Sequence, residues 1–518
     1  MFARVYSGAL SGVDAYRVEV EVDYCGGIGQ ILIVGLPDTA IKESQERVRS
    51  AIKACDFILP PCKKWVINLA PADTRKEGPS FDLPIAVAVL SASGYVPCQR
   101  LSEFWMVGEL GLDGSVRGTT GVLPVAISAR AEGFASVIVP EPNAQEAALI
   151  DGLTVYPVSH LKQVVDILCD PDRCPRLRSQ ARSTYQRLQT TQNFPLDFGE
   201  VKGQTFAKRG LLIAAAGRHN VLMVGPPGAG KSMLAQRLPG IMPPLEFDEA
   251  LELTKLYSVA GLTTRGGIIC DRPFRAPHHS ASMSGLLGGG SWPRPGEISL
   301  SHHGVLFLDE LTEFPRHHVD AFRQPLESGC VTISRANQTL SYPAQFLMVG
   351  ACNPCPCGYK GDLVKYCRCT SYQAEKYWSK LSGPFLDRID LQIEMTRISE
   401  VDLVKTNMTM ESDEMRLLVA RAVKRQRGRF GEGEPFCYNG QLSQQHLHRF
   451  CRVSDACRDM LARAISTLGL SARAYDRILR IARTIADLDD ARDIDSKHLG
   501  EAIRYRAPVS EVLSGVTK

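Results

Sequence analysis

The sequence contains no apolar run long enough to cross a membrane, and it has no internal repeat or low-complexity tract. The longest apolar runs, such as residues 83–90, fall well short of the roughly 20 residues that a membrane-spanning helix needs. The first residues, MFARVYSGALSG, lack the apolar stretch of a signal peptide. These absences argue against membrane, secreted and repeat proteins, and we expect the chain to act in the cytoplasm.

The chain also lacks a strong net charge, because it carries only +4 over 518 residues. This balance permits a nucleic-acid partner without indicating one, since such a surface depends on where the charges cluster. Its 16 cysteines are diluted over a length that suggests about three domains. In a reducing cytosol, clustered cysteines favour a metal site over disulfides.

Residues 1–170 have the pattern of a mixed α/β domain. Residues 18–22 alternate valine with acidic side chains, as in a half-buried strand, and a second apolar strand is predicted at residues 31–35. Residues 40–52 place their apolar side chains on one helical face. Residues 171–198 lose this periodicity, are rich in Arg, Gln, Thr and Pro, and are predicted to be a linker.

The rest of the chain divides into an alternating part and a helical part. Between residues 199 and 395, strands and helices alternate around glycine-rich turns, which fits a nucleotide-binding α/β domain. Residues 396–518 have a helical pattern, with Ser471 as the expected N-cap of a helix at 472–488. We therefore expect an α/β protein with an N-terminal α/β domain, an ATPase domain and a C-terminal all-α lid.

A phosphate-binding loop is the clearest motif in the sequence. An apolar strand, residues 220–224, runs directly into the GxxxxGK[ST] pattern, and a helix with the sequence MLAQRL follows. Glycines let backbone N–H groups surround the phosphates, and the helix N-terminus adds its positive dipole end. Lys231 is expected to reach the β- and γ-phosphates of ATP, and Ser232 to bind Mg²⁺. The residues expected to contact the nucleotide are Gly225, Pro226, Pro227, Gly228, Ala229, Gly230, Lys231, Ser232 and Met233.

Two further apolar strands deliver polar side chains that complete an ATP site. The first, residues 304–308, is followed directly by Asp309 and Glu310. Asp309 is expected to complete the magnesium shell and Glu310 to orient the attacking water, the arrangement called Walker B. Residues 346–351 end near Asn353, whose amide is expected to contact the γ-phosphate or the water, as sensor 1 does in AAA+ ATPases. With the phosphate-binding loop, these strands predict ATP hydrolysis.

Four cysteines form two Cys-x-Cys pairs, Cys355 with Cys357 and Cys367 with Cys369, separated by nine residues. Four thiolates on one compact, turn-rich segment suit tetrahedral Zn²⁺. The spacing is tighter than the usual Cys-x₂-Cys, and a set of reduced, metal-free cysteines is the alternative. In the segment 352–369, a bound metal would stiffen a loop near the ATP site or a central pore.

Several longer strings resemble the ComM/YifB family of magnesium-chelatase-like AAA+ proteins, and they are spread over essentially the whole chain. The strings are GLPDTAIKESQERVRSAI, VINLAPADTRKEGPSFDLPIA, VKGQTFAKRG, FRAPHHSAS, PGEISLSHHGVLFLDE, NPCPCG and LSGPFLDRIDL. The resemblance implies a homohexameric, ATP-driven DNA motor, a helicase or branch-migration translocase that acts in homologous recombination during natural transformation. Its implied partners are single-stranded, duplex or branched DNA and a recombinase.

A second function class remains open beside the DNA motor. A chelatase-like motor that remodels a protein or inserts a metal would carry the same ATP site. The chain has no Asp-x-Ser-x-Ser metal-adhesion motif, so a partner subunit would have to supply it in that case.

The resemblance also assigns residues around the ATP site. Arg388, in the string LDRID, matches the arginine finger that reaches the γ-phosphate of a neighbouring subunit, and a structural Asp–Arg ion pair is the alternative. Arg473 resembles the sensor 2 arginine at the start of a lid helix, with pairing to a nearby carboxylate as the alternative. Gly203 and Gln204 resemble the segment that borders adenine, or they only shape the end of the linker.

The N-terminal domain resembles the Lon-protease-like (S5-type) α/β fold. The string KEGPS, which ends at Ser80, matches the nucleophile segment of Lon-type Ser–Lys proteases, and a GELG stretch at residues 108–111 is also present. Leu123, however, stands where the general-base lysine belongs, and a serine without a base is a weak nucleophile. We expect a Lon-like domain without peptidase activity that serves as an assembly or DNA-contact ring.

Two segments are candidates for contact with DNA. Residues 331–340 are predicted to form a hairpin, which points into the pore in related motors. Arg335 on this hairpin is a candidate phosphate contact, and a solvated arginine is the equal alternative. The basic and histidine side chains of residues 272–279 lie in a segment that resembles the helix-2 insert, another pore element, although the histidines would also suit capping or packing.

Overall fold

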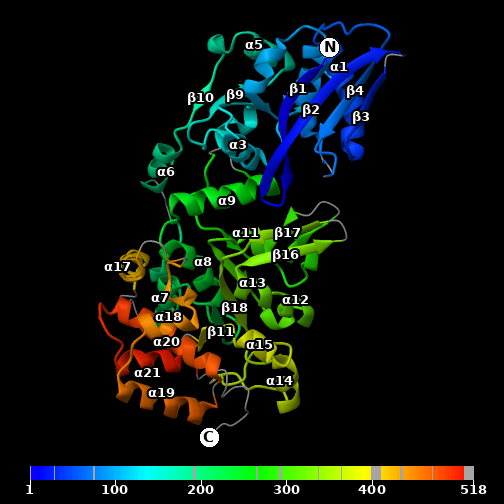
Figure 1. Ribbon diagram of the computed structural model, residues 1–518. Helices are drawn as coiled ribbons and strands as arrows, with labels where there is room; N and C mark the ends of the chain where they lie inside the picture. The colour runs from blue at the N-terminus through cyan, green and yellow to red at the C-terminus, as the bar shows by residue number, and fades with distance from the viewer. Residues whose placement is uncertain are drawn as a thin grey trace.

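The computed structural model describes residues 2–27, 30–73, 76, 78–190, 194–263, 267–290, 294–335, 338–362, 364–397, 410–431, 434, 436–469 and 471–506. An eight-stranded sheet from the N-terminal third lies at one end of the molecule, and a five-stranded sheet with the C-terminal helices lies at the other. Helix α9 (Phe247–Ala260) lies between the two (Figure 1). None of the described helices is both long and apolar enough to span a membrane.

The N-terminal sheet has a core on each face. Its strand order is β10-β9-β8-β5-β1-β2-β4-β3. The strands are β1 (Ala3–Ser11), β2 (Asp14–Gly26), β3 (Gln30–Val34), β4 (Lys63–Ala70), β5 (Phe104–Met106), β8 (Ser136–Pro140), β9 (Thr154–Val158) and β10 (Leu177–Arg178). The three valines of β2 are fully buried while the residues between them are half-buried, so the predicted alternation is confirmed. In β8, Ile138 joins one apolar cluster, and Val137 and Val139 join the cluster on the opposite face.

Helices cover both faces of this sheet. α1 (Thr39–Ala54) packs on α2 (Asp82–Ala92), every residue of which is buried, and α2 packs on β1 and β2. α3 (Val122–Ala131) and α4 (Ala144–Ala147) line the apolar cluster on the other face. α1 begins at Thr39, directly after Asp38, whose carboxylate accepts a hydrogen bond from the Ile41 N–H at 2.7 Å. This N-cap satisfies a first-turn donor that has no partner within the helix.

Residues 171–198, predicted to be a linker, contain regular secondary structure. The segment contains β10, which pairs with β9 at the edge of the sheet, and α6 (Ala181–Thr190). Ala181 and Tyr185 of α6 are buried in an apolar cluster that also contains Ala250 and Leu253 of α9. Because only these two positions of α6 are buried, its hydrophobic period is too weak to identify a helix from the sequence.

The ATPase sheet is parallel throughout, in the order β12-β15-β18-β11-β19. Its strands are β11 (Val221–Val224), β12 (Phe274–Arg275), β15 (Val305–Leu308), β18 (Leu347–Cys352) and β19 (Leu391–Glu394). The three central strands are completely buried, as parallel strands covered on both faces must be. Since the strands are parallel, the segments that follow β11, β15 and β18 all leave from the same edge of the sheet.

The C-terminal helices share a core with one face of this sheet. They are α17 (Ser412–Phe430), α18 (Gln444–Phe450), α19 (Asp455–Leu468), α20 (Ala472–Leu488) and α21 (Ser496–Arg504). α17 and α20 pack on α7 (Thr205–Gly217), and their apolar side chains join one cluster with those of β11 and β19. The Ser471 hydroxyl accepts the Ala474 N–H at 3.3 Å, so the predicted N-cap of α20 is confirmed.

Shorter elements complete the described part of the chain. The remaining helices are α5 (Leu161–Cys169), α8 (Lys231–Ile241), α10 (Met283–Leu287), α11 (Glu297–Leu300), α12 (Arg316–Ala321), α13 (Arg323–Ser328), α14 (Ser371–Trp378) and α15 (Gly383–Leu386). Two-stranded sheets are formed by β6 (Glu109–Leu110) with β7 (Val116–Arg117), β13 (Gly288–Gly289) with β14 (Arg294–Pro295), and β16 (Cys330–Arg335) with β17 (Gln338–Pro343). The last pair is the hairpin expected from the sequence.

The N-terminal unit rests on α9 and on the β16–β17 hairpin (Figure 1). Lys255 of α9 forms an ion pair with Asp14 at the tip of the β1–β2 hairpin. The neighbouring Val13 packs into an apolar cluster with Leu340 and Tyr342 of β17. The candidate DNA hairpin is therefore braced by the N-terminal domain on one side.

Candidate functional site

The edge of the parallel sheet brings the predicted ATP-site residues together. The Ser232 hydroxyl donates to a carboxylate oxygen of Asp309 at 2.8 Å, which joins the end of β11 to the end of β15. The Lys231 ammonium donates to the side-chain carbonyl of Asn353 at 3.2 Å, which joins β11 to β18. Lys231, Ser232, Asp309 and Asn353, which span 122 positions of the chain, therefore lie around one point.

The phosphate-binding loop has the backbone that its glycines permit. Gly228 and Gly230 have φ values of +78° and +89°, in the left-handed region that favours glycine. A Cβ atom at Gly225 would lie 2.6 Å from the Met395 carbonyl oxygen, so this position excludes any larger residue. Pro227 is exposed in the loop, and Met233 is exposed in the first turn of α8. The loop thus presents backbone N–H groups without interference from side chains.

Lys231 lies in a nearly buried position, with only 9% of its surface exposed. Burial is the main cause that lowers the pKa of Lys231, and the carboxylates of Asp309 and Glu310 oppose this effect. The ammonium also donates to the carbonyl oxygens of Gly225 at 2.6 Å and Pro226 at 3.0 Å. These acceptors hold the Lys231 ammonium inside the loop, where phosphate oxygens bind in proteins with a phosphate-binding loop.

Glu310 has an unusual backbone and a histidine neighbour. Its φ of +48° is left-handed, and its own N–H donates to Asp309 at 2.9 Å. His279 places Nδ1 3.6 Å from a carboxylate oxygen of Glu310. The sequence places His279 in the pore-insert segment, but it gives no sign of this contact, which is formed only when the segment after β12 folds over the end of β15.

Gln204 connects the linker end to the phosphate-binding loop. Gln204 has a left-handed φ of +54° at the start of α7, and Gly203 has a φ of +63°. The Gln204 side-chain amide donates to the Ala229 carbonyl at 3.1 Å and to the Thr396 carbonyl at 2.7 Å. This residue therefore ties the loop to the strand end after β19, and its role beside adenine stays a prediction.

Arg388 pairs with an acidic residue outside its own motif. Its guanidinium forms an ion pair with Glu327 of α13 and donates to the Pro384 carbonyl. Asp390 pairs instead with Arg477 of α20 and accepts the Asn220 N–H at 3.0 Å. Arg388 and Asp390 thus have separate partners, and the described ion pair of Arg388 is with a glutamate and not with an aspartate.

Arg473 is exposed at the start of α20, and it forms no hydrogen bond or ion pair with another described residue. Arg335 ends β16, but its side chain lies outside the described part of the structure. In the insert, Arg272 is buried and donates to the carbonyls of Pro243 and His303, each at 2.5 Å. Arg272 is therefore a structural residue and not a surface contact.

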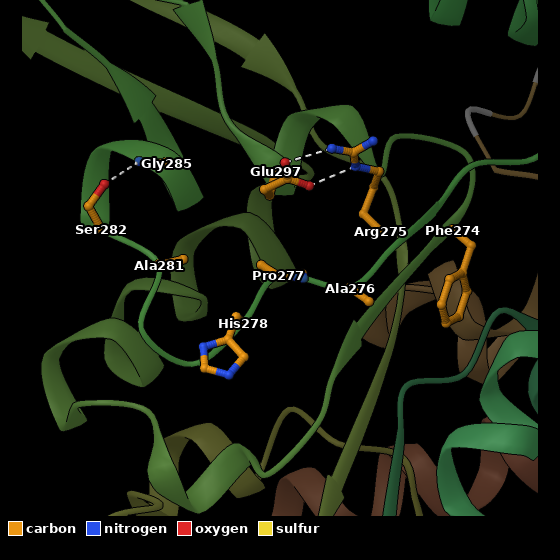
Figure 2. A pocket seen from close by; sticks show the side chains of 9 residues that line it. All are labelled: Phe274, Arg275, Ala276, Pro277, His278, Ala281, Ser282, Gly285 and Glu297. Carbon is orange, nitrogen blue, oxygen red and sulfur yellow. Dashed lines mark hydrogen bonds and ion pairs between the residues drawn. The ribbon is translucent and has the colours of Figure 1, made fainter.

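An open pocket of about 580 Å³ lies between β12 and α11 (Figure 2). The charged side chain of Arg275 forms a two-pronged ion pair with Glu297, with both distances at 2.6 Å. His278 also lines the pocket, and its ring packs against that of His279 with ring centroids 4.0 Å apart. The pocket is thus linked through two histidines to Glu310.

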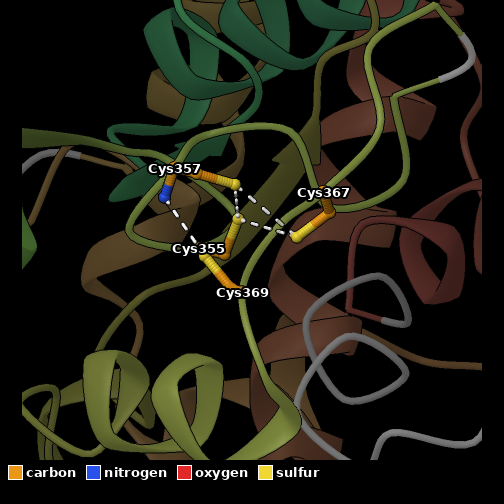
Figure 3. A group of neighbouring side chains, drawn as sticks. All are labelled: Cys355, Cys357, Cys367 and Cys369. Carbon is orange, nitrogen blue, oxygen red and sulfur yellow. Dashed lines mark hydrogen bonds between the residues drawn. The ribbon is translucent and has the colours of Figure 1, made fainter.

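The four predicted cysteines converge on one point (Figure 3). The Sγ atom of Cys355 lies 3.4 Å from that of Cys357 and 3.6 Å from that of Cys367, and all four sulfurs lie within 4.8 Å of one another. A tetrahedron with Zn–S bonds of about 2.3 Å has edges of about 3.8 Å, so the spacing fits a zinc ion. Burial opposes ionisation of Cys357, but N–H groups of Tyr359 and Arg368 and the neighbouring thiols lower its pKa to about 6.

The cysteine cluster is in direct contact with the phosphate-binding loop. Gly358, directly after Cys357, has a φ of +83°, and a Cβ atom there would lie 2.7 Å from Cδ of Pro227. The nearest side-chain atom of Asn353 would be 3.9 Å away. Only glycine lets the segment after Cys357 pack this closely on the loop, so the position of each segment depends on the other.

The Lon-like residues of the N-terminal domain lie apart from the ATP site. Ser80 is in a short 3₁₀ turn, where its carbonyl oxygen accepts the Gly108 N–H at 2.9 Å. Leu123 is fully buried in the apolar cluster with Leu253, and its N–H donates to the Ser258 hydroxyl of α9 at 3.4 Å. Leu123, which the sequence predicts to stand in place of the Lon-type lysine, is therefore part of the contact with α9.

Family profiles match the chain in three stretches. The profile described as magnesium chelatase, subunit ChlI, matches residues 197–403. The profile described as subunit ChlI of Mg-chelatase matches residues 20–143, and that of the subunit ChlI C-terminal region matches residues 409–506.

Full-length relatives agree with these profiles. The chain is 43% identical over 509 residues to competence protein ComM of Haemophilus influenzae, which covers 98% of each protein. It is 42% identical over 507 residues to the uncharacterized protein YifB of Escherichia coli, with 97% of this chain and 96% of that protein covered. A match to the Lon protease of Brevibacillus choshinensis is 29% identical over 166 residues, 30% of this chain and 21% of the protease. With the mixed α/β structure, this match confirms the Lon-like fold expected at the N-terminus.

The length and identity of these matches, together with the geometry of the ATP-site edge, confirm the resemblance found in the sequence. The chain belongs to the ComM/YifB family of magnesium-chelatase-like AAA+ proteins, an ATPase family that uses ATP and Mg²⁺.

Proposed function

We propose that the ATP site works with the roles assigned from the sequence. Lys231 and the loop N–H groups hold the phosphates, Ser232 and Asp309 ligate Mg²⁺, Glu310 orients the water, and Asn353 contacts the γ-phosphate. Bound Mg²⁺ neutralises charge on the β- and γ-phosphate oxygens. The 2.8 Å contact between Ser232 and Asp309 supports this proposal, because it brings two oxygen ligands of a hard cation together.

We further propose that the chain is a homohexameric DNA translocase that migrates branched DNA during natural transformation. The observation that carries this proposal is the continuity between the candidate DNA hairpin and the ATP site. β17 ends at Pro343, and β18 begins at Leu347 and leads to Asn353, which bonds to Lys231. A displacement of the hairpin by DNA would therefore pass along a buried strand to the nucleotide. The competence name of the Haemophilus relative supports the same role.

Stimulation of ATP hydrolysis by DNA tests this function. We expect branched DNA to raise the ATPase rate of the wild type more than single-stranded or duplex DNA does. We also expect the branch point of a synthetic four-way junction to migrate in an ATP-dependent reaction. Arg335→Ala should bring the ratio of stimulated to basal rate towards one, because a phosphate contact is lost. Arg316→Ala, at an exposed arginine of α12, is the matched control. If no DNA raises the rate and no junction moves, the chelatase-like remodelling motor becomes the better function.

The cysteine cluster is proposed to be a structural zinc site. Four sulfurs at tetrahedral spacing support this, as does the coordination of zinc by four cysteines in other structural sites. Because Gly358 packs on Pro227, the metal would fix the segment that supports the phosphate-binding loop.

Removal of the metal gives a direct test of the cluster. Metal analysis of the purified chain should find about one zinc per chain, as expected for one four-thiolate site. The double substitution Cys357→Ser and Cys369→Ser should abolish it and weaken ATP binding. Cys437→Ser, at an exposed cysteine outside the cluster, should change neither quantity. A metal-free wild type that binds ATP normally would leave four reduced cysteines as the correct interpretation.

The domain division at residues 1–170, 171–198, 199–395 and 396–518 also stays a proposal. We propose that the N-terminal Lon-like domain has no peptidase activity and acts as a brace for α9 and the β16–β17 hairpin. Support comes from Leu123, which is packed into the contact with α9 where a protease would need a lysine. A recombinase is the proposed protein partner.

A further inference from the structure

The segment beside the cysteine cluster exposes two tyrosine rings almost completely. Tyr366 is 90% exposed and Tyr372 is 71% exposed. Val364, next to Tyr366, is 76% exposed. Aromatic side chains bury much of their surface in most folded proteins, so two such rings within seven residues indicate a contact with a partner.

The two tyrosines lie next to the cysteine cluster and to the capped start of α14 (Ser371–Trp378). Tyr366 directly precedes Cys367, and Tyr372 follows Cys369 by three residues. Between them, Thr370 forms a capping box with Gln373 at the start of α14. Six residue steps hold the Cα atoms of the two tyrosines within about 22 Å of one another. The rings are therefore displayed on a local scaffold that is supported from both sides.

Cationic side chains alternate with these rings. Lys365, Arg368 and Lys376 are all exposed, and the Lys365 ammonium lies 5.0 Å from the ring centroid of Tyr359. The carboxylate of Asp362, an acidic neighbour, is engaged by the N–H groups of Val364 and Lys365 at 2.8 and 3.0 Å. We use the name tyrosine face for Tyr366 and Tyr372 with Lys365, Arg368 and Lys376.

We propose that the tyrosine face binds single-stranded DNA, with bases stacked on the two rings and phosphates held by the three cations. Stacking on aromatic side chains beside a positive surface is the usual way in which proteins bind single strands without sequence preference. This proposal rests on the proposed action on DNA and gives that function a second contact site besides Arg335.

A second copy of the chain is the competing occupant, and the composition of the face argues against it. The core of a protein–protein interface is enriched in aromatic residues and arginine but depleted in lysine and serine. Two of the three cations of the tyrosine face, Lys365 and Lys376, are lysines, and Ser371 lies beside Tyr372. Interleaved rings and cations match a chain of bases and phosphates better than they match an apolar subunit surface.

The face is also connected to the ATP site. Cys357 donates its N–H to the Cys369 sulfur at 3.4 Å, and Gly358 next to it packs on Pro227 of the phosphate-binding loop. The cysteine cluster therefore lies between a DNA strand bound to Tyr366 and Tyr372 and the phosphate-binding loop.

Substitution to leucine separates stacking from simple apolar contact. Full-length wild type and the double variant Tyr366→Leu, Tyr372→Leu are compared by fluorescence anisotropy with labelled oligothymidylate. The variant should bind at least roughly tenfold more weakly, because each stacked base contributes strongly to affinity. Tyr366→Trp with Tyr372→Trp should retain binding, and Leu417→Ala, at a residue that is 67% exposed on α17, is the control. Arg368→Gln should lower the slope of log affinity against log salt by about 0.7.

Each outcome decides the proposal. Zinc content and ATP binding of the variants show that they remain folded. Unchanged oligothymidylate affinity in the leucine variant overturns the tyrosine face, even if DNA still stimulates the wild-type ATPase. Loss of hexamers by mass photometry with unchanged DNA affinity assigns the face to a second copy of the chain and also overturns it. Absence of DNA stimulation in the wild type overturns the translocase function instead.

Discussion

Replacing Glu310 by Gln should leave ATP binding intact and slow its hydrolysis by roughly 10²–10⁴-fold, the usual contribution of a positioned acid–base group. Glu310 follows the buried strand β15, and Asp309 beside it bonds to Ser232 of the phosphate-binding loop. The amide of glutamine has nearly the same shape but cannot accept a proton from the attacking water. A fluorescent ATP analogue measures binding, and phosphate release measures turnover.

Two comparisons make this result specific to Glu310. Glu313→Gln, three residues later at an exposed position that pairs with Lys380, should retain wild-type turnover. Lys231→Ala should lose nucleotide binding as well, because the buried ammonium that faces Asn353 disappears. Normal turnover in Glu310→Gln would remove Glu310 from the proposed role.

Replacing Arg388 by Ala should lower the ATPase rate by roughly 10³-fold or more, as for other arginine fingers. The proposal is that this guanidinium stabilises the charge of the transition state in the neighbouring subunit. In the structure the buried guanidinium pairs with Glu327, whose side chain is 58% exposed, so as a finger it would have to leave this partner to reach a phosphate at a subunit contact. Mixing Arg388→Ala with Lys231→Ala chains should raise the rate above that of either variant, because some mixed sites then hold an intact lysine and an intact arginine.

The ion pair itself provides the control for a structural role. If Arg388 only stabilises the fold through Glu327, then Glu327→Gln and Arg388→Ala should lower the rate equally. If Arg388 acts as a finger, Glu327→Gln should retain most of the activity while Arg388→Ala does not. Mixed hexamers of the two inactive variants that never regain activity would show that Arg388 does not act on a neighbour.

The sequence alone determined the elements whose signal is local. The valines of β2 predict their strand because the period of two is a property of neighbouring residues. The phosphate-binding loop, Asp309 with Glu310, and the four cysteines are recognised from residue type and spacing, and the structure brings each set together. The N-cap at Ser471 is local in the same sense, because a hydroxyl and an N–H three residues later form it.

Tertiary structure decided everything that depends on contacts between distant segments. α6 was not recognised, because two buried positions give no period and only α9 makes them a helix face. The partner of Arg388 is Glu327, 61 residues away, which no motif around LDRID indicates. His279 reaches Glu310, and Gly358 reaches Pro227, only because strand ends meet at one edge of a parallel sheet. Spacing along a chain fixes which groups are available, but the packing of strands and helices fixes which of them touch.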